Sequence, residues 1–215
     1  MSHHSTTFKN FSYLIPIHFS EKGIEDYSYQ LQQIINLIID YDLPEAKDIS
    51  VSTQNKLKRL LYIISESVPF TPNISKLALQ IETTRPILMV MLYILEESKL
   101  IRNLRASTKG ISLMNKPEKI LLFNPNWIKT LSDKGWNTGN IREPFILDQL
   151  KNAGLEVTYP SEEDFLINGN ILLEIRGKNK TSSQVSNVDN HLVVSNEIEI
   201  GWRKQIPLYL LGFLY

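Results

Sequence analysis

The chain has 215 residues, no cysteine, an apolar content of 42% and 23 acidic residues balanced by 23 basic ones. This length and composition suit one large domain or two to three small ones, each with a real hydrophobic core. The absence of cysteine excludes a disulfide framework and thiolate zinc sites, and it favours a reducing compartment such as the cytoplasm. The sequence has no run long enough for a signal peptide or a membrane span, so we expect no membrane contact.

The charge is unevenly distributed along the chain. Residues 1–52 hold three basic and seven acidic residues, a net charge of −4, whereas residues 53–110 hold nine and four, a net charge of +5. Residues 111–215 hold eleven and twelve, a net charge of −1. The middle segment is therefore the candidate for contact with an anion such as nucleic acid, and a solvated basic face is the alternative interpretation.

The first segment, residues 1–52, is predicted to be helical. Apolar residues recur at helical spacing over residues 27–39, and Pro44 is expected to break the helix that they form. Adjacent His3 and His4 make a poor preformed metal site because both are flexible. We expect this acidic segment to pack on another part of the chain, since alone it buries little.

The second segment, residues 53–125, has the order of a winged helix-turn-helix, with three helices followed by a two-stranded ribbon. Thr53 is expected to cap the first helix, which carries Leu57, Leu60, Leu61 and Ile64 on one apolar face. Asn73 is expected to cap the second helix, and Pro86 lies in the first turn of the third. The strings "LIRNLR" and "KILLFN" are predicted to be the two strands of the ribbon.

The third helix of this segment is apolar on every side of its first two turns, from Ile87 to Leu92. A helix that reads DNA bases needs polar side chains on its outer face. This helix is therefore expected to be buried on two faces or to meet a protein partner. The other interpretation is phosphate contact through the wing residues Arg102, Arg105 and Lys109.

The third segment, residues 136–215, has an α/β layout. The string "TGNIREPFILDQLKNAG" predicts a helix that ends at Gly154, with Phe145, Ile146 and Leu150 facing inward. The expected elements after it are a strand "LEVTYP", a hairpin within "EEDFLINGNILLEIRGKNK", a strand "HLVVSN" and a short C-terminal helix started by Pro207. Together the three segments predict a mixed α+β fold.

The hairpin admits two registers. A two-residue turn at Asn168-Gly169 places Asp164 across the sheet from Glu174, whereas a three-residue turn places the two acids directly opposite each other. We expect the three-residue turn. Two facing acids repel each other unless a cation lies nearby, and Arg176, on the same face by alternation, supplies that charge.

The strings "SVPFTPNISKLA", "LEESKLIRNLRASTKGISLMNKPEKILLFN", "REPFILDQL", "EVTYP", "DFLINGNILLEIRGKNK", "EIEIG" and "IPLYLLGFLY" together resemble the C-terminal half of a family of prokaryotic P-loop ATPases of the AAA+ class. The resemblance covers nearly the whole chain from about Tyr27 onward. It implies a lid-like helical segment over 1–52, a winged helix over 53–125 and a PD-(D/E)XK nuclease-like domain over 136–215. The chain lacks a G-x-x-x-x-G-K-[ST] motif, so we expect no ATP binding. It is expected to be a fragment, a truncated gene product or a stand-alone descendant.

The same resemblance assigns candidate site residues. It implies Glu143, Asp164 and Glu174 as carboxylate ligands of Mg²⁺, with Arg176 at the position of the catalytic lysine and Lys178 as its possible substitute. Arginine stays protonated and cannot act as a base. We therefore expect a non-catalytic accessory module, without a bound cofactor, that contacts a partner protein, an ATPase domain or nucleic acid. The alternative is a Mg²⁺-dependent nuclease.

Overall fold

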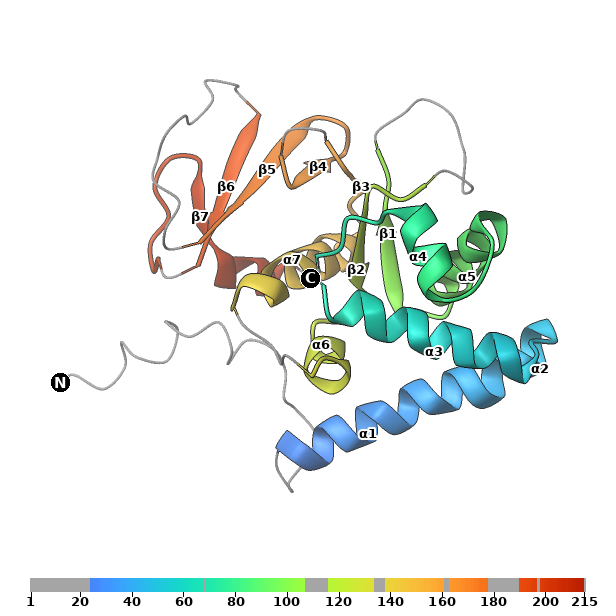
Figure 1. Ribbon diagram of the computed structural model, residues 1–215. Helices are drawn as coiled ribbons and strands as arrows, with labels where there is room; N and C mark the ends of the chain where they lie inside the picture. Colours follow the sequence, from blue (N-terminus) through green and yellow to red (C-terminus); the bar gives the residue numbers. More distant parts are fainter. Residues whose placement is uncertain are drawn as a thin grey trace. The chain divides into compact units, whose positions relative to one another are not determined.

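The computed structural model describes residues 24–67, 69–106, 116–133, 138–160, 163–177, 190–196 and 198–214. Their contacts divide the chain into two compact units (Figure 1). We call residues 24–105 and 116–133 the helical unit, and Ala106 with the described residues from Thr138 onward the sheet unit. Each unit contains both helices and strands, which confirms the mixed α+β class.

The first helix of the helical unit does not stop where the sequence predicts. α1 (Ile24–Leu37) continues through a π-helical turn, η2 (Ile38–Asp42), directly into α2 (Leu43–Lys47). Pro44 was expected to break the helix, and this prediction is wrong. The proline lies in the first turn of α2, where a missing N–H is tolerated.

The π-helical turn explains how the chain passes Pro44. The backbone N–H of Leu43 donates to the carbonyl of Ile38, five residues back, so the turn is wider than an α-helical one. A residue in an α-helix donates its N–H to the carbonyl four residues back, which for Pro44 is the carbonyl of Asp40. Proline has no N–H, so Pro44 cannot make this hydrogen bond. The Gln54 side chain donates to that carbonyl instead, through Nε2 at 3.3 Å, so the carbonyl keeps a partner.

The next helix, α3 (Val51–Ser65), carries much of the core of the helical unit. Its cap is Ser50, whose Oγ accepts a hydrogen bond from the Thr53 N–H at 3.3 Å. The predicted cap, Thr53, is wrong because Thr53 already lies in the first turn. The predicted inward face is confirmed, and its buried residues are Leu57, Leu60, Leu61 and Ile64.

Two shorter helices follow and meet at a sharp angle. α4 (Ile74–Gln80) and α5 (Arg85–Glu97) are joined by residues 81–84, and the helix axes bend by 89° across this turn. Asn73 caps α4 as predicted, and Pro86 lies in the first turn of α5. The inner face of α5 is buried through Leu88, Met91, Leu92, Ile94 and Leu95.

A small antiparallel ribbon follows α5 in the helical unit. β1 (Ile101–Leu104) and β2 (Lys119–Leu122) pair with each other as predicted, and an antiparallel bridge joins Phe70 to Ile120 of β2. One further helix, α6 (Asn126–Leu131), contacts both α1 and α3. It was not predicted, since its six residues are too few to show a helical period.

The sheet unit begins with α7 (Thr138–Asn152), whose predicted inward residues Phe145, Ile146 and Leu150 are buried. After it, Gly154 has φ +77°, in the left-handed region where glycine is preferred. α7 packs against β3 (Val157–Thr158) and against the C-terminal 3₁₀ helix η3 (Leu208–Phe213), which follows Pro207 as predicted.

The five strands of the sheet unit lie in chain order, β3-β4-β5-β6-β7. The first three pair antiparallel, whereas β6 runs parallel to β5 and β7 parallel to β6 (Figure 1). The strands are β3 (Val157–Thr158), β4 (Phe165–Ile167), β5 (Ile171–Arg176), β6 (His191–Ser195) and β7 (Gln205–Pro207).

Among the described residues, no single helix is long and apolar enough to cross a membrane. α4 and α5 reach that length and apolar content only when taken together across their 89° bend.

Candidate functional site

The candidate site lies on the hairpin of β4 and β5, which has the predicted three-residue turn. Ile167 pairs with Ile171, which confirms this register over the two-residue alternative. Asn168 and Gly169 have φ values of 50° and 67°. Both residue types accept the left-handed conformation that such a turn requires.

The residue pairs of this register end at Phe165 and Leu173, and Asp164 lies one residue before them. One oxygen of Asp164, Oδ2, accepts a hydrogen bond from the backbone N–H of Ile175 at 2.7 Å. β4 begins only at Phe165, so this carboxylate extends the hydrogen bonding of the hairpin just before the strand starts. Asp164, which was predicted to be a Mg²⁺ ligand, therefore accepts a hydrogen bond from the backbone of the hairpin.

Arg176 lies beside Glu174, as predicted. The guanidinium Nη2 is 2.9 Å from Glu174 Oε2, and the two side chains are only 11% and 14% exposed. The hydrogen bond to Glu174 raises the pKa of Arg176 above its usual value despite the opposing effect of burial, and the negative charges of Glu174 and Glu163 add to the increase. The cation is therefore permanent, and it sits where the resemblance implies a lysine.

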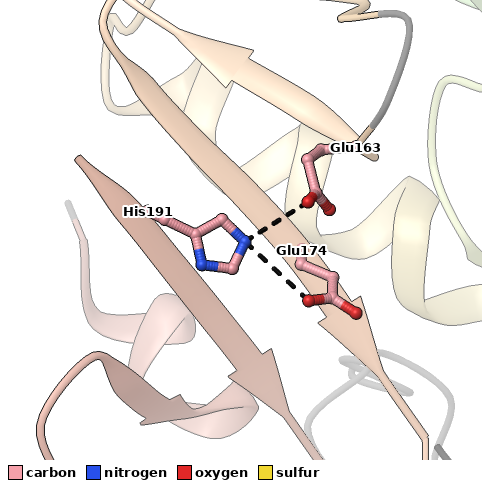
Figure 2. A group of neighbouring side chains, drawn as sticks. All are labelled: Glu163, Glu174 and His191. Atoms are coloured by element: carbon pink, nitrogen blue, oxygen red, sulfur yellow. Dashed lines mark ion pairs between the residues drawn. The ribbon is translucent and has the colours of Figure 1, made fainter. Parts of the chain in front are cut away.

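Glu174 of this ion pair also belongs to a group of three side chains that can hold a metal ion. The other two members are Glu163 and His191. His191 Nε2 lies 3.5 Å from Glu163 Oε1 and 3.8 Å from Glu174 Oε2 (Figure 2). Each residue offers one ligand atom, and these atoms all lie within 4.8 Å of one another. Two carboxylate oxygens and one imidazole nitrogen thus converge on a common position.

The parallel pairing of β5 with β6 places the imidazole of His191 next to the carboxylate of Glu174. Leu172 pairs with His191 and Glu174 with Val193. Because side chains alternate along a strand, Leu172, Glu174 and His191 share one face of the sheet. His191, at the start of β6, therefore points toward the carboxylate of Glu174 on the neighbouring strand (Figure 2).

The remaining residues predicted for the nuclease-like site lie elsewhere or outside the described residues. Glu143 is half-buried on α7, and it is not in the first turn of that helix, which contains no acidic residue. It is not a member of the group formed by Glu163, Glu174 and His191. Lys178 lies outside the described residues.

The predicted wing cations have partners within the helical unit. The Arg102 guanidinium lies 3.9 Å from the centre of the Phe123 ring. Arg105 Nη2 is 2.8 Å from Glu96 Oε2. Lys109 lies outside the described residues. These contacts hold Arg102 and Arg105 against their own unit, and the Glu96 carboxylate offsets the charge that Arg105 presents to a phosphate.

Sequence reasoning missed Glu163 and His191. Strand alternation favours Asp164 over Glu163 as the neighbour of Glu174, but alternation applies only within a strand, and β4 begins at Phe165. His191 opens a strand whose next three residues are apolar. A lone histidine at a strand start was the available signal, since most buried strand positions are apolar.

The chain was also compared with known proteins. No family model, no curated protein and no solved structure matches it.

Proposed function

We propose that this chain is a non-catalytic accessory module that docks a partner protein through the outer face of α5. The observation that carries the proposal is an exposed apolar stripe on that helix: Ile87 is 52% exposed, Val90 49% and Tyr93 41%. These residues are spaced three apart, so they follow one another along one side of the helix. Contiguous exposed apolar patches usually mark interaction sites.

The partner that fits this stripe is an amphipathic helix with an apolar face flanked by acidic side chains. Residues 53–110 carry a net charge of +5, and Lys76 on α4 and Arg85 at the start of α5 are exposed. Acidic flanks would complement this charge, speed association and disfavour basic partners. An amphipathic helix placed on an apolar surface is a common way of recognising a partner.

Two features support the winged-helix interpretation of this unit. The 89° bend between α4 and α5 is close to the angle between the helices of a helix-turn-helix. An antiparallel ribbon then follows α5, as a wing would. Reading of DNA bases is disfavoured because the exposed stripe of α5 is apolar. Partner docking is one of the roles that the resemblance to the AAA+ class implies, beside assembly and contact with nucleic acid.

The docking surface can be tested with a helical peptide that has leucines on one face and glutamates on its flanks. We expect the full chain to bind it and the double variant Ile87→Glu, Val90→Glu to bind it roughly tenfold or more weakly, because apolar anchors carry most of the energy of such interfaces. Fluorescence anisotropy of the labelled peptide measures both affinities.

Tyr29→Glu is the matched control, because Tyr29 is an exposed aromatic on α1 of the same unit. This variant should bind like the unmodified chain. Equal losses in the control and the double variant would contradict docking at α5. A parallel titration with duplex DNA tests whether the partner is nucleic acid instead of protein. DNA binding that depends on Arg102 or Arg105 and weakens steeply with salt would contradict the proposal.

A Mg²⁺-dependent nuclease is the second candidate, and the three-residue turn of the hairpin, which that function requires, favours it. Against it, Arg176 pairs with Glu174 and supplies no base. We expect no cleavage of plasmid or single-stranded DNA with Mg²⁺ or Mn²⁺, and no gain in Arg176→Lys. Cleavage that is lost in both Asp164→Ala and Glu174→Ala would establish the nuclease instead.

A further inference from the structure

His191 is a deeply buried polar side chain of the sheet unit. It is 1% exposed, and among the described residues neither ring nitrogen has a hydrogen-bond partner. The distances from Nε2 to Glu163 and Glu174, 3.5 and 3.8 Å, exceed those of a good hydrogen bond. A buried imidazole without partners is unfavourable, so its environment points to a ligand that it binds.

The two carboxylates next to Nε2 define what that ligand is. Glu163 and Glu174 approach the same nitrogen from the start of the hairpin and from β5 (Figure 2). Their side chains are 22% and 14% exposed, so the group is shielded but reachable from solvent. Two carboxylates and an imidazole nitrogen are donor types that bind a divalent metal ion.

We propose that Glu163, Glu174 and His191 bind a divalent transition-metal ion of the Zn²⁺ type. Donor atoms around a shared Zn²⁺ lie about 3–3.5 Å apart, and here they lie within 4.8 Å of one another, so small side-chain rotations complete the arrangement. Imidazole nitrogen favours Zn²⁺ over Mg²⁺, which prefers a shell made entirely of oxygen. This site differs from the Mg²⁺ site predicted at Glu143, Asp164 and Glu174, and it does not rest on the docking function.

Arg176 competes with the metal for one ligand. Its Nη2 holds Glu174 Oε2 at 2.9 Å, and the same oxygen faces His191 Nε2. A bound cation therefore has to share that carboxylate with the guanidinium, and the positive charge of Arg176 lowers the affinity of the site. Removing this charge is expected to strengthen metal binding, an effect that simple disruption of the site would not produce.

The test is calorimetric titration of the metal-stripped full chain with Zn²⁺ and, separately, with Mg²⁺. The chain has four histidines, so His3, His4 and His18 are first replaced by alanine to remove binding outside the site. We expect one Zn²⁺ per chain and Mg²⁺ binding at least 100-fold weaker. Absence of Zn²⁺ binding, or Mg²⁺ binding of equal strength, would overturn the proposal.

Variants in this background locate the site. Glu163→Gln keeps the shape of a partly exposed side chain and should weaken Zn²⁺ binding about 100-fold, as loss of a ligand is at least as harmful as loss of its supporting residue. Asp164→Asn keeps an acceptor for the Ile175 N–H and should bind Zn²⁺ unchanged. Loss in Asp164→Asn, or unchanged binding in Glu163→Gln, would place the metal elsewhere.

Two further readouts complete the experiment. Arg176→Gln should bind Zn²⁺ about tenfold more tightly, since a unit of positive charge next to a ligand is removed; the same or weaker binding would overturn the role of Glu174. Zn²⁺ should also shift the Nε2 resonance of His191 in ¹⁵N-detected NMR spectra, and an unchanged imidazole signal at saturation would contradict direct ligation. Circular dichroism confirms that each variant is folded.

Discussion

Replacement of Phe165 by alanine is expected to lower the free energy of unfolding of the sheet unit by about 3–5 kcal/mol. The Phe165 ring is fully buried, and the residue pairs in register with buried Leu173. By alternation, it packs on the sheet face opposite Glu174. Alanine would leave a cavity on that face of the hairpin and remove the contacts that hold it in place. Urea denaturation followed by circular dichroism measures the loss.

Leu166→Ala provides the comparison on the neighbouring residue. Leu166 is only half-buried, so its truncation should lower the free energy of unfolding by about 1 kcal/mol. Hydrogen exchange should show that Phe165→Ala reduces protection mainly in the sheet unit and leaves the helical unit protected. Equal losses for the two variants, or equal loss of protection in the two units, would contradict this assignment.

Glu96→Ala is expected to lower the free energy of unfolding of the helical unit by about 2–3 kcal/mol. The Glu96 carboxylate accepts hydrogen bonds from the backbone N–H and from Nδ2 of Asn103, each at 3.0 Å. It also binds Arg105 Nη2 at 2.8 Å. Asn103 is buried, so truncation leaves its donors without this acceptor and weakens the link between α5 and β1.

Glu97→Ala is a control one residue away. Glu97 pairs with Lys47 at 2.8 Å, but both side chains are well exposed to solvent. Solvent screens such a pair, so its loss should matter far less than that of Glu96. Chemical denaturation of both variants under the same conditions gives the difference. A loss in Glu97→Ala as large as in Glu96→Ala would show that the network around Asn103 contributes nothing specific.

Local sequence signals were sufficient for most helices and for the hairpin. Apolar spacing predicted the buried face of α3, and an electrostatic argument chose the hairpin register that the pairing of Ile167 with Ile171 confirms. The errors are also local. Ser50 and Thr53 both carry a hydroxyl suited to capping. The π-helical turn before Pro44 receives a hydrogen bond from Gln54, which lies on the next long helix.

The group formed by Glu163, Glu174 and His191 could not be predicted in the same way. Glu163 joins it because the chain leaves strand geometry before Phe165, and alternation does not extend beyond a strand. His191 joins it through parallel pairing with β5, whose register is set by a connection far longer than a hairpin turn. Contacts between strands that are separated in the sequence leave no local periodic signal.

The parallel pairing of β5 with β6 also sets an order of events during folding. A hairpin such as β4–β5 forms within about 1–10 μs, so Glu174 and Arg176 take their places early. β6 pairs in parallel with β5 although the two strands are separated in the sequence, and such non-local pairing is slower. The negative charges and their arginine are therefore expected to assemble first, with the imidazole arriving last. Any property that depends on His191 is acquired only when the folding of the sheet unit is nearly complete.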